Sequence, residues 1–264
     1  MSQIELSQLW RYPVKSMRGA QHQELAIGPR GFSYDRHWML TDEQGRFLTQ
    51  RELPQMVLIR TQVIGEQLQL EIPGQAPYLM PNHDDKERVV TVWGDQCKAR
   101  RADAQADAML SEFLQRPCSL VSLPQNEKRQ VDLRFAQEGD EVGFADGFAF
   151  LLISEASLES FNCHLDTPVK MERFRPNIVV SGCEAFAEDQ WKRIRIGEIE
   201  FEVCKPCSRC GIPGIDPDTA EKNKFVLTNL AEHNKRGNKT YFGQNLIHRQ
   251  TGDLQQGMQV EVLA

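Results

Sequence analysis

Short apolar stretches separated by turn residues fill the first half of the chain. Residues 4–6 alternate between apolar and polar side chains, which is the period of a strand with one buried face. Residues 56–64 and 68–72 flank Gly65 and predict a hairpin. Residues 89–93 are apolar and β-branched and end in a Gly-Asp turn. Many short strands at close spacing predict a barrel or a curved sheet rather than a parallel α/β sheet.

One amphipathic helix interrupts these strands at residues 104–115. Asp103 precedes it as an N-cap, and Pro117 ends it. Apolar side chains at spacings of three and four residues form a stripe that would face a core. That stripe comprises Ala106, Met109, Leu110, Phe113 and Leu114.

The second half mixes strands with helices. A polar and charged stretch at residues 124–140 favours a boundary, so we predict domains at residues 1–122 and 123–264. The fold class that follows is mainly β (α+β) with a few helices. Strands are predicted at residues 148–153, 177–180 and 260–263, a hairpin at 193–203, and helices from Ser154 onward and at 228–235.

Composition narrows the class of protein. Of the 264 residues, 40% are hydrophobic, which is enough for a sizeable core and too many for a disordered chain. The 31 basic and 37 acidic side chains give a net charge of −6, so no overall attraction to nucleic acid or anionic lipid exists. The longest clean apolar run, at residues 148–153, is far shorter than the roughly 20 residues of a membrane-spanning helix. Neither nucleic acid nor a membrane is therefore an expected partner.

The seven cysteines indicate a reducing compartment. Their count is odd, and residues 1–10 carry no secretory signal, which together argue for free thiols rather than a disulfide framework. We therefore expect a cytoplasmic protein whose cysteines are core residues or metal ligands.

The densest chemical signal is the string Cys204-Lys-Pro-Cys207-Ser-Arg-Cys210. Thiolates are soft ligands that select soft or redox-active metals. A ferredoxin-type cluster would need a fourth cysteine at position 214, where the chain has glycine. A zinc site would need a distant ligand such as Cys183 or a histidine. The other interpretations are one thiolate on a metal whose remaining ligands come from a cofactor, or three semi-buried thiols in a loop.

Cationic and hydroxyl side chains recur beside predicted turns. Arginine forks and lysine suit phosphate groups, and a helix start such as that at Ser154 favours an anion. Taken singly, each of these groups is more often a solvent-exposed charge or one partner of a structural ion pair. Together, in a chain of net negative charge, they indicate a bound anionic cofactor. The groups are Lys15, Ser16, Arg18, Arg36, Thr49, Arg51, Ser154, Arg173, Arg175 and Asn177.

Ordered motifs along essentially the whole chain resemble the MOSC family. Tyr12-Pro-Val-Lys15-Ser16 comes first, and Asp35-Arg36 follows before an aromatic strand. The later motifs keep the family's order. They are Ser154-Glu-Ala-Ser157, Phe174-Arg-Pro-Asn177, residues 191–197, Lys205-Pro-Cys-Ser-Arg-Cys210, Asp216-Pro and Phe242-Gly-Gln-Asn245. Within the family, the chain looks like the YcbX-type proteins and the mitochondrial amidoxime-reducing components.

The resemblance implies a MOSC N-terminal β-barrel-like region, then a MOSC-domain β-barrel with a few helices. It also implies a molybdenum cofactor (Mo-molybdopterin). In that family the pterin dithiolene and one cysteine hold the metal, and the matching catalytic ligand is Cys210. Ser208 and Arg209 would contact the cofactor. The pterin and its phosphate would be held by Lys15, Ser16, Arg36, Arg175 and Asn177, with help from Ser154 at its helix start.

The activity that the resemblance implies is reduction of N-hydroxylated small molecules, such as hydroxylamines, amidoximes and N-hydroxy bases. Relatives carry two threonines after the ligand cysteine, where this chain has Pro213 and Gly214. Longer relatives end in a ferredoxin domain, whereas this chain ends at Ala264, so we expect a separate ferredoxin- or flavoprotein-type electron donor. The alternatives are a sulfur carrier, a cofactor-binding module without turnover, and a structural zinc or iron–sulfur protein.

Overall fold

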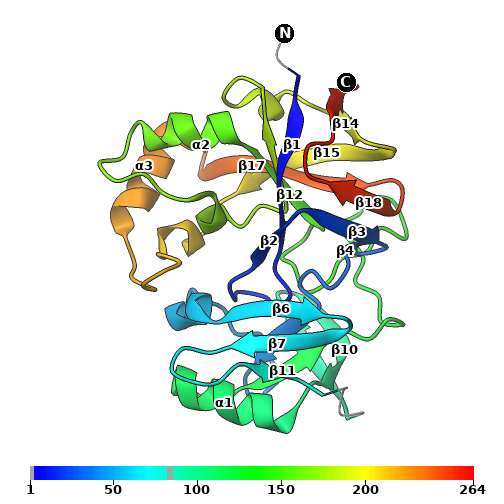
Figure 1. Cartoon of the computed structure of the whole chain (residues 1–264), viewed down its shortest axis with the longest axis vertical. Helices are drawn as coiled ribbons and strands as arrows, with labels where there is room; N and C mark the ends of the chain where they lie inside the picture. Colours follow the sequence, from blue (N-terminus) through cyan, green and yellow to red (C-terminus); the bar gives the residue numbers. More distant parts are fainter. Residues whose placement is uncertain (1–2, 82–85) are drawn as a thin grey trace.

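Two lobes, both built mainly of β-strands, make up the molecule (Figure 1). The computed structural model describes residues 3–81 and 86–264. Within these ranges the α-helices are α1 (Ala104–Leu114), α2 (Glu155–Asn162) and α3 (Lys224–Asn234). No helix in the described part is both long and apolar enough to cross a membrane. The predicted mainly β (α+β) fold is confirmed.

A nine-stranded sheet that curves into a half-barrel forms the upper lobe of Figure 1. Its order is β19-β14-β15-β17-β12-β13-β1-β2, and β16 pairs with β17. The first strand of the chain therefore pairs with β13, far away in sequence. The strands are β1 (Glu5–Arg11), β2 (Ala20–His22), β12 (Phe150–Ser154), β13 (Ile178–Ser181), β14 (Arg193–Ile196), β15 (Ile199–Ser208), β16 (Lys235–Arg236), β17 (Lys239–His248) and β19 (Val260–Val262).

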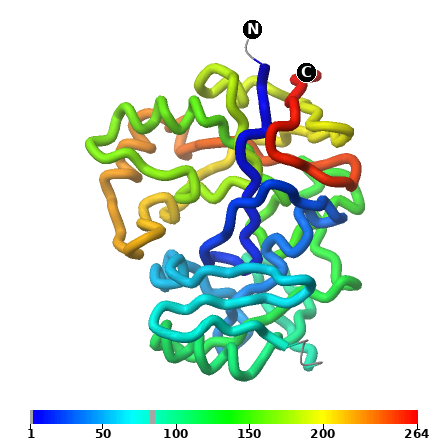
Figure 2. Tube along the Cα trace, in the orientation of Figure 1, coloured from blue at the N-terminus to red at the C-terminus, as the bar shows by residue number. Residues whose placement is uncertain are grey.

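The apolar side chains of this sheet explain why the start of the chain joins it. Leu6 and Leu9 on β1 are fully buried in the same core as Phe150 and Phe201. As a result, the start of the chain lies beside its last strand, where the Val260 amide donates to the Ile4 carbonyl at 2.8 Å. Figure 2 shows β1 and β19 side by side at one end of the molecule.

Smaller sheets complete the fold. The lower lobe contains the sheets β5-β11-β10-β9 and β6-β7-β8, and a third sheet, β18-β3-β4, flanks the upper lobe. Helix α1 contacts β11 and begins at the predicted cap, since the Asp103 side chain accepts from the Ala106 amide. The strands are β3 (Glu24–Gly28), β4 (Gly31–Phe32), β5 (Trp38–Thr41), β6 (Arg60–Ile64), β7 (Gln67–Glu71), β8 (Tyr78–Leu79), β9 (Glu87–Val92), β10 (Asp95–Arg101), β11 (Ser119–Ser122) and β18 (Gly252–Gln255).

Two sequence predictions need correction. The predicted helix at residues 228–235 begins earlier, because the Asn223 side chain caps α3 by accepting from the Phe225 amide at 2.9 Å. The first part of the predicted strand at residues 56–64 is instead a short 3₁₀-helix, η1 (Pro54–Leu58), with proline at its start. The hairpin itself forms as expected between β6 and β7.

The first two cysteines of the string lie on a strand, and Cys210 comes just after its end. The predicted hairpin of β14 and β15 is present, but β15 continues through Cys204 and Cys207 to Ser208. The continuation pairs with β17, which the sequence pattern did not reveal, and the register shifts twice along this pair. Such irregularities bend a strand and redirect its side chains, so the three thiols do not share one environment.

Candidate functional site

One open cavity collects most of the residues singled out in the sequence. It encloses about 820 Å³, counting the part open to solvent. Its walls come from segments spread between residues 15 and 245, so only the tertiary fold creates it. The predicted site residues that line it are Lys15, Ser16, Arg36, Arg175, Asn177, Ser208, Arg209 and Cys210.

Three of these residues sit in strained backbone conformations. Ser16, Arg36 and Arg175 have φ angles of 67°, 45° and 58°. Residues other than glycine rarely adopt this left-handed backbone conformation, and such strain concentrates at functional sites. At Arg175 the conformation follows the 3₁₀-helix η2 (Met171–Phe174), for which Arg175 is the C-cap. The backbone therefore aims three polar side chains at one cavity at some cost in conformational energy.

Lys15 is a neutralised cation. It is only 5% exposed, its Nζ donates to the Phe144 carbonyl at 2.8 Å, and it forms an ion pair with Asp146. Burial lowers the pKa of Lys15, and the ion pair opposes that shift. Burial alone would raise the pKa of Asp146, yet the Lys15 charge holds it well below its ordinary value. This pair adds little net positive charge to the cavity.

Arg175 is a cation without an anionic partner. Its Nη1 donates to the Met17 carbonyl at 2.6 Å, and within residues 3–81 and 86–264 it forms no ion pair with a carboxylate. Arg36, by contrast, bonds to Asp35 at 2.5 Å and to the Asn177 Oδ1 at 2.9 Å. Burial, and then the Arg36 charge, lower the pKa of Arg175 to about 10. A bound anion would relieve this uncompensated charge.

The buried ring of Tyr12 contacts both of these arginines. The guanidinium carbons of Arg36 and Arg175 lie 4.4 and 4.3 Å from the ring centre, within cation–π range. The ring fits against Gly19, where a Cβ atom would come within 2.4 Å of it. The Tyr12 hydroxyl is buried and has no hydrogen-bond partner in the described residues. Burial raises the pKa of Tyr12, so the phenol stays neutral.

The three thiols of the cysteine string differ in access to the cavity. Cys204 does not line it and donates to the Glu202 carbonyl at 3.4 Å. Burial raises the pKa of Cys204 to about 12, so that sulfur remains a protonated thiol. Cys207 is half-buried and contacts the Arg209 Nη1 at 3.2 Å. Cys210 is exposed on the cavity wall, and it is therefore the thiol most open to a ligand.

The metal chemistry of the site follows from this arrangement. In the part of the chain that the structure describes, no three His, Cys, Asp or Glu side chains gather as a metal site. A zinc or iron–sulfur centre held only by such side chains therefore lacks its ligands there. A metal on Cys210 would have to bring most of its other ligands with it.

Ser154 departs from the expected cofactor-binding set. It is fully buried, does not line the cavity, and caps α2 by accepting from the Ser157 amide at 3.1 Å. Its backbone amide donates to the Glu188 Oε1 at 3.0 Å. Since its hydrogen-bonding groups are used inside the fold, its role in this structure is to begin the helix.

Other cavity residues lie outside the set that the resemblance assigns to the cofactor. Thr49 and Arg51 line the wall and belong to the cationic groups noted in the sequence. The Arg51 guanidinium stacks on Trp93, 4.5 Å from the ring centre. Asp146 and Asn245 also line the wall. Nothing in the sequence around Asp146 indicates that it would neutralise Lys15, because the two are 131 positions apart.

Comparisons with known proteins agree across nearly the whole chain. Residues 3–117 match the MOSC N-terminal beta barrel domain, and residues 139–261 match the MOSC domain. Mitochondrial amidoxime-reducing component 1 of Mus musculus is 31% identical over 98% of this chain and 82% of that protein. The Homo sapiens protein of that name has the same identity and coverage. Molybdenum cofactor sulfurase of Danio rerio is 32% identical over 94% of this chain but only 32% of its own length.

Proposed function

The chain belongs to the MOSC family, and we propose that it binds the molybdenum cofactor through Cys210 and reduces N-hydroxylated small molecules. The relatives named amidoxime-reducing components support the reaction class. The observation that carries the proposal is the cavity, which joins an exposed thiol to an arginine that lacks an anionic partner. A thiolate ligand and an anion site are what a metal-carrying phosphorylated pterin requires.

The cavity has two ends with different chemistry. We call Ser16, Arg36 and Arg175 the anion end, and residues 207–210 the thiol end. The anion end would bind the pterin phosphate with hydroxyl and guanidinium donors. The thiol end would supply the soft sulfur of Cys210 to the metal. When bound, the cofactor supplies a redox-active metal that can accept an oxygen atom.

The protein's own groups shape the remainder of the site. Arg209 is held by its Nη2, which donates to the Phe174 carbonyl at 2.7 Å, so its charge stays beside the thiols. That charge stabilises an anionic sulfur. Phe148 and Ile212 give the wall an apolar part, against which the organic body of a substrate can pack.

The reaction also needs a source of electrons. Reduction of a hydroxylamine to an amine releases water and consumes two electrons and two protons. The described residues offer no cluster of protein ligands for a second metal centre. We therefore include in the proposal a separate electron-donor protein of the ferredoxin or flavoprotein type.

Expression in a host that makes the cofactor provides the test. The wild-type protein is expected to contain molybdenum and pterin and to reduce benzamidoxime with an artificial reductant. Cys210→Ala is expected to lose molybdenum and activity together, because the metal loses its protein ligand. Cys204→Ala is the matched control, since that thiol lies outside the cavity. Wild-type levels of molybdenum in Cys210→Ala would refute the ligand assignment.

A second candidate function is transfer of sulfur, or storage of the cofactor, without reduction. The similarity to molybdenum cofactor sulfurase favours it, because that match extends over 94% of this chain. Under this alternative the purified protein would hold molybdenum yet leave benzamidoxime unchanged with every artificial reductant tried. The same preparation therefore discriminates between the two functions.

A further inference from the structure

The segment that follows Cys210 has little regular structure of its own. Between the end of β15 and the start of α3 it contains only the single turn η4 (Ile212–Gly214). Its internal backbone hydrogen bonds are those of short turns and one isolated bridge, such as the bond from the Asp216 amide to the Glu221 carbonyl at 2.8 Å. These turns fix the local shape of the segment, residues 211–223, whereas its contacts with η2 and α3 set where it lies in the fold.

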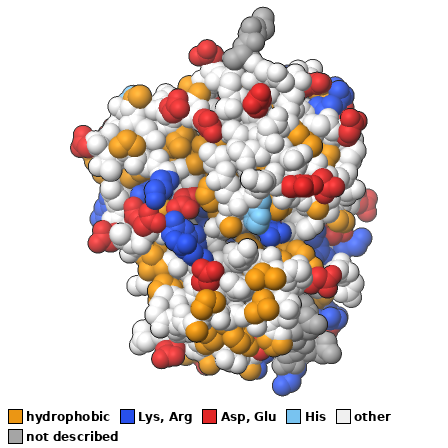
Figure 3. Space-filling model, in the orientation of Figure 1, with side chains coloured by type: hydrophobic (Ala, Val, Ile, Leu, Met, Phe, Trp, Pro, Cys, Tyr) orange, Lys and Arg blue, Asp and Glu red, His pale blue; other side chains and the backbone are white. Residues whose placement is uncertain are grey.

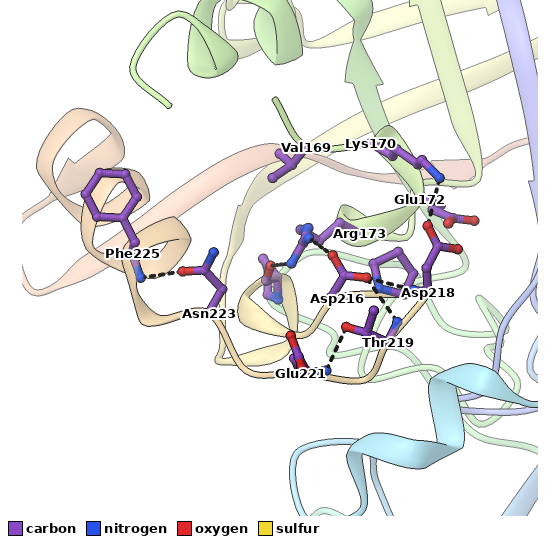
Figure 4. A network of polar contacts seen from close by, with 12 residues as sticks. Val169, Lys170, Glu172, Arg173, Asp216, Asp218, Thr219, Glu221, Asn223 and Phe225 are labelled. Atoms are coloured by element: carbon purple, nitrogen blue, oxygen red, sulfur yellow. Dashed lines mark hydrogen bonds and ion pairs between the residues drawn. The ribbon is translucent and has the colours of Figure 1, made fainter. Parts of the chain in front are cut away.

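Arg173 holds this segment at two points. The side chain is only 8% exposed; its Nη2 donates to the Asp216 Oδ2 at 2.7 Å and its Nη1 to the Pro213 carbonyl at 3.3 Å. Figure 4 shows Arg173 directed at Asp216 in the middle of a wider polar network. Because the guanidinium is a rigid planar fork, two such bonds fix the direction of the segment as well as its distance.

Asp216 in turn binds two backbone amides of the segment. Its Oδ1 accepts from the amides of Asp218 at 2.9 Å and Thr219 at 3.1 Å (Figure 4). Burial would raise the pKa of Asp216, but these backbone bonds and the Arg173 charge outweigh it and lower the pKa. The carboxylate is therefore charged at neutral pH and uses one oxygen for Arg173 and the other for the turn.

Helix α3 holds the segment from the opposite side. Asn223, the last residue of the segment and the N-cap of α3, donates its amide to the Gly214 carbonyl at 2.6 Å. A Cβ atom at Gly214 would come within 2.9 Å of the Leu227 side chain, so glycine allows this close approach to the helix. The turn η4 of this segment therefore packs against both η2 and α3.

The residues next to Arg173 reach both ends of the cavity. The Phe174 carbonyl accepts from Arg209 at the thiol end, and Arg175 belongs to the anion end. Three consecutive residues of η2 and its cap therefore contact the segment after Cys210, the residue before Cys210, and the anion end.

We propose that Arg173 is a positioning residue that sets the distance between the Cys210 thiol and the anion end, so that one bound molecule can span both. The proposal rests on the function proposed above, because it assumes a ligand with an anion and a thiol-seeking metal. Arg173 itself does not line the cavity and acts through Asp216 and Pro213.

A network on the rim supplies the matched control. Arg18 donates to Glu172 at 2.6 Å and to Asp218 at 2.8 Å, and Lys170 pairs with Asp218 at 2.8 Å. Basic and acidic side chains gather together between the two lobes on the face in Figure 3. Lys170 is 68% exposed and pairs with Asp218, so Lys170→Gln removes an exposed charge from the same segment while both Arg173 bonds, to Asp216 and Pro213, stay in place. Exposed pairs of this kind contribute little to stability.

The experiment compares Arg173→Gln, Arg173→Lys and Lys170→Gln in a host that makes the cofactor. In Arg173→Gln, molybdenum per chain is expected to fall at least about tenfold, as is typical when a group that orients a metal ligand is removed. The thiolate-to-metal absorption of the remaining loaded protein is expected to shift, which a loss of stability alone would not cause. Arg173→Lys should be intermediate, because an ammonium keeps the charge but lacks the fork. Lys170→Gln should match wild type.

Hydrogen exchange on the cofactor-free proteins gives a readout that needs no metal. Peptides covering residues 211–223 are expected to exchange faster in Arg173→Gln than in Lys170→Gln or wild type. If wild type holds no molybdenum, the proposed function fails while this measurement still judges the role of Arg173. Unchanged exchange in Arg173→Gln would overturn the proposal, as would wild-type molybdenum content with an unshifted absorption. Should Arg173→Gln fail to fold, the same comparisons are made with Arg173→Lys.

Discussion

The anion end and the thiol end of the cavity are built on opposite physical principles. At the anion end, Arg175 is half-buried, forms no ion pair with a carboxylate in the described residues, and has a strained backbone, so the free protein holds an unfavourable charge before any ligand arrives. At the thiol end, Cys210 is exposed and its side chain costs nothing in desolvation. One end is therefore preorganised by burial, whereas the other depends on neighbours for its position. We therefore expect a substitution at the anion end to change both stability and anion binding, and a substitution at the thiol end to change metal binding with little effect on stability.

The largest expected effect comes from replacing one side chain at each end, Arg175 at the anion end and Cys210 at the thiol end. In the cofactor-free protein, Arg175→Met should raise the free energy of unfolding by about 1 kcal/mol, since replacing a half-buried charge that lacks a carboxylate partner by an apolar group is often stabilising. Cys210→Ala should change it by less than about 0.5 kcal/mol, because the side chain is exposed. Urea unfolding measures both. Each variant should nevertheless lose molybdenum.

Equal stability changes in these two variants would remove the distinction between the ends. Binding of inorganic phosphate by calorimetry supplies the control. Arg175→Met should weaken phosphate binding, while Cys210→Ala should leave it at the wild-type level.

A second effect concerns the aromatic support of the anion end. Tyr12→Leu removes the ring beneath Arg36 and Arg175 and leaves a cavity, so we expect a loss of about 2–4 kcal/mol in unfolding free energy and weaker phosphate binding. Tyr12→Phe keeps the ring and removes a buried hydroxyl that has no partner in the described residues, so stability should stay equal or rise by up to about 1 kcal/mol. Thermal unfolding and phosphate titration measure the pair. A destabilised Tyr12→Phe would mean that the hydroxyl has a partner after all.

The smallest effect lies outside both ends. Burial, and then the Arg11 charge, lower the pKa of His22 to about 4. The unfolded chain therefore binds a proton more readily than the folded one between about pH 6.5 and 4, and stability falls as pH decreases through this window. His22→Gln should flatten that part of the curve, with a residual slope from His248, whose pKa burial also lowers. Denaturation midpoints at several pH values would show it. Since neither histidine lines the cavity, Arg175→Met and Cys210→Ala should keep the wild-type slope.

Local chemistry made several features predictable. Asp103 and Ser154 cap helices as the sequence indicates, because a cap is a contact between residues three apart. The β14–β15 hairpin follows from its alternating pattern and Gly197, which has a φ angle of 59°. The same capping bond, however, occupies the Ser154 hydroxyl, and Ser154 does not line the cavity.

Non-local contacts were harder to foresee. The strand β17, which redirects the cysteine string, has no clear alternation of its own and is recognised only by its pairing with β12 and β15. The late start of the predicted 56–64 strand and the early start of α3 depend on Pro54 and Asn223. Each is a single residue, and its signal for the end of an element is weaker than the apolar pattern around it.

By itself the sequence determined the mainly β class, the principal caps and hairpins, the family, and the set of residue types suited to a thiol-ligated metal and an anion. The tertiary structure alone decided which members of that set act together. It paired Lys15 with Asp146 and left Arg175 without a carboxylate ion pair in the described residues, and it kept the half-buried Cys204 out of the cavity while exposing Cys210 on its wall. The physical reason is that charge compensation and burial depend on neighbours brought together from more than a hundred positions away, and no local pattern records those neighbours.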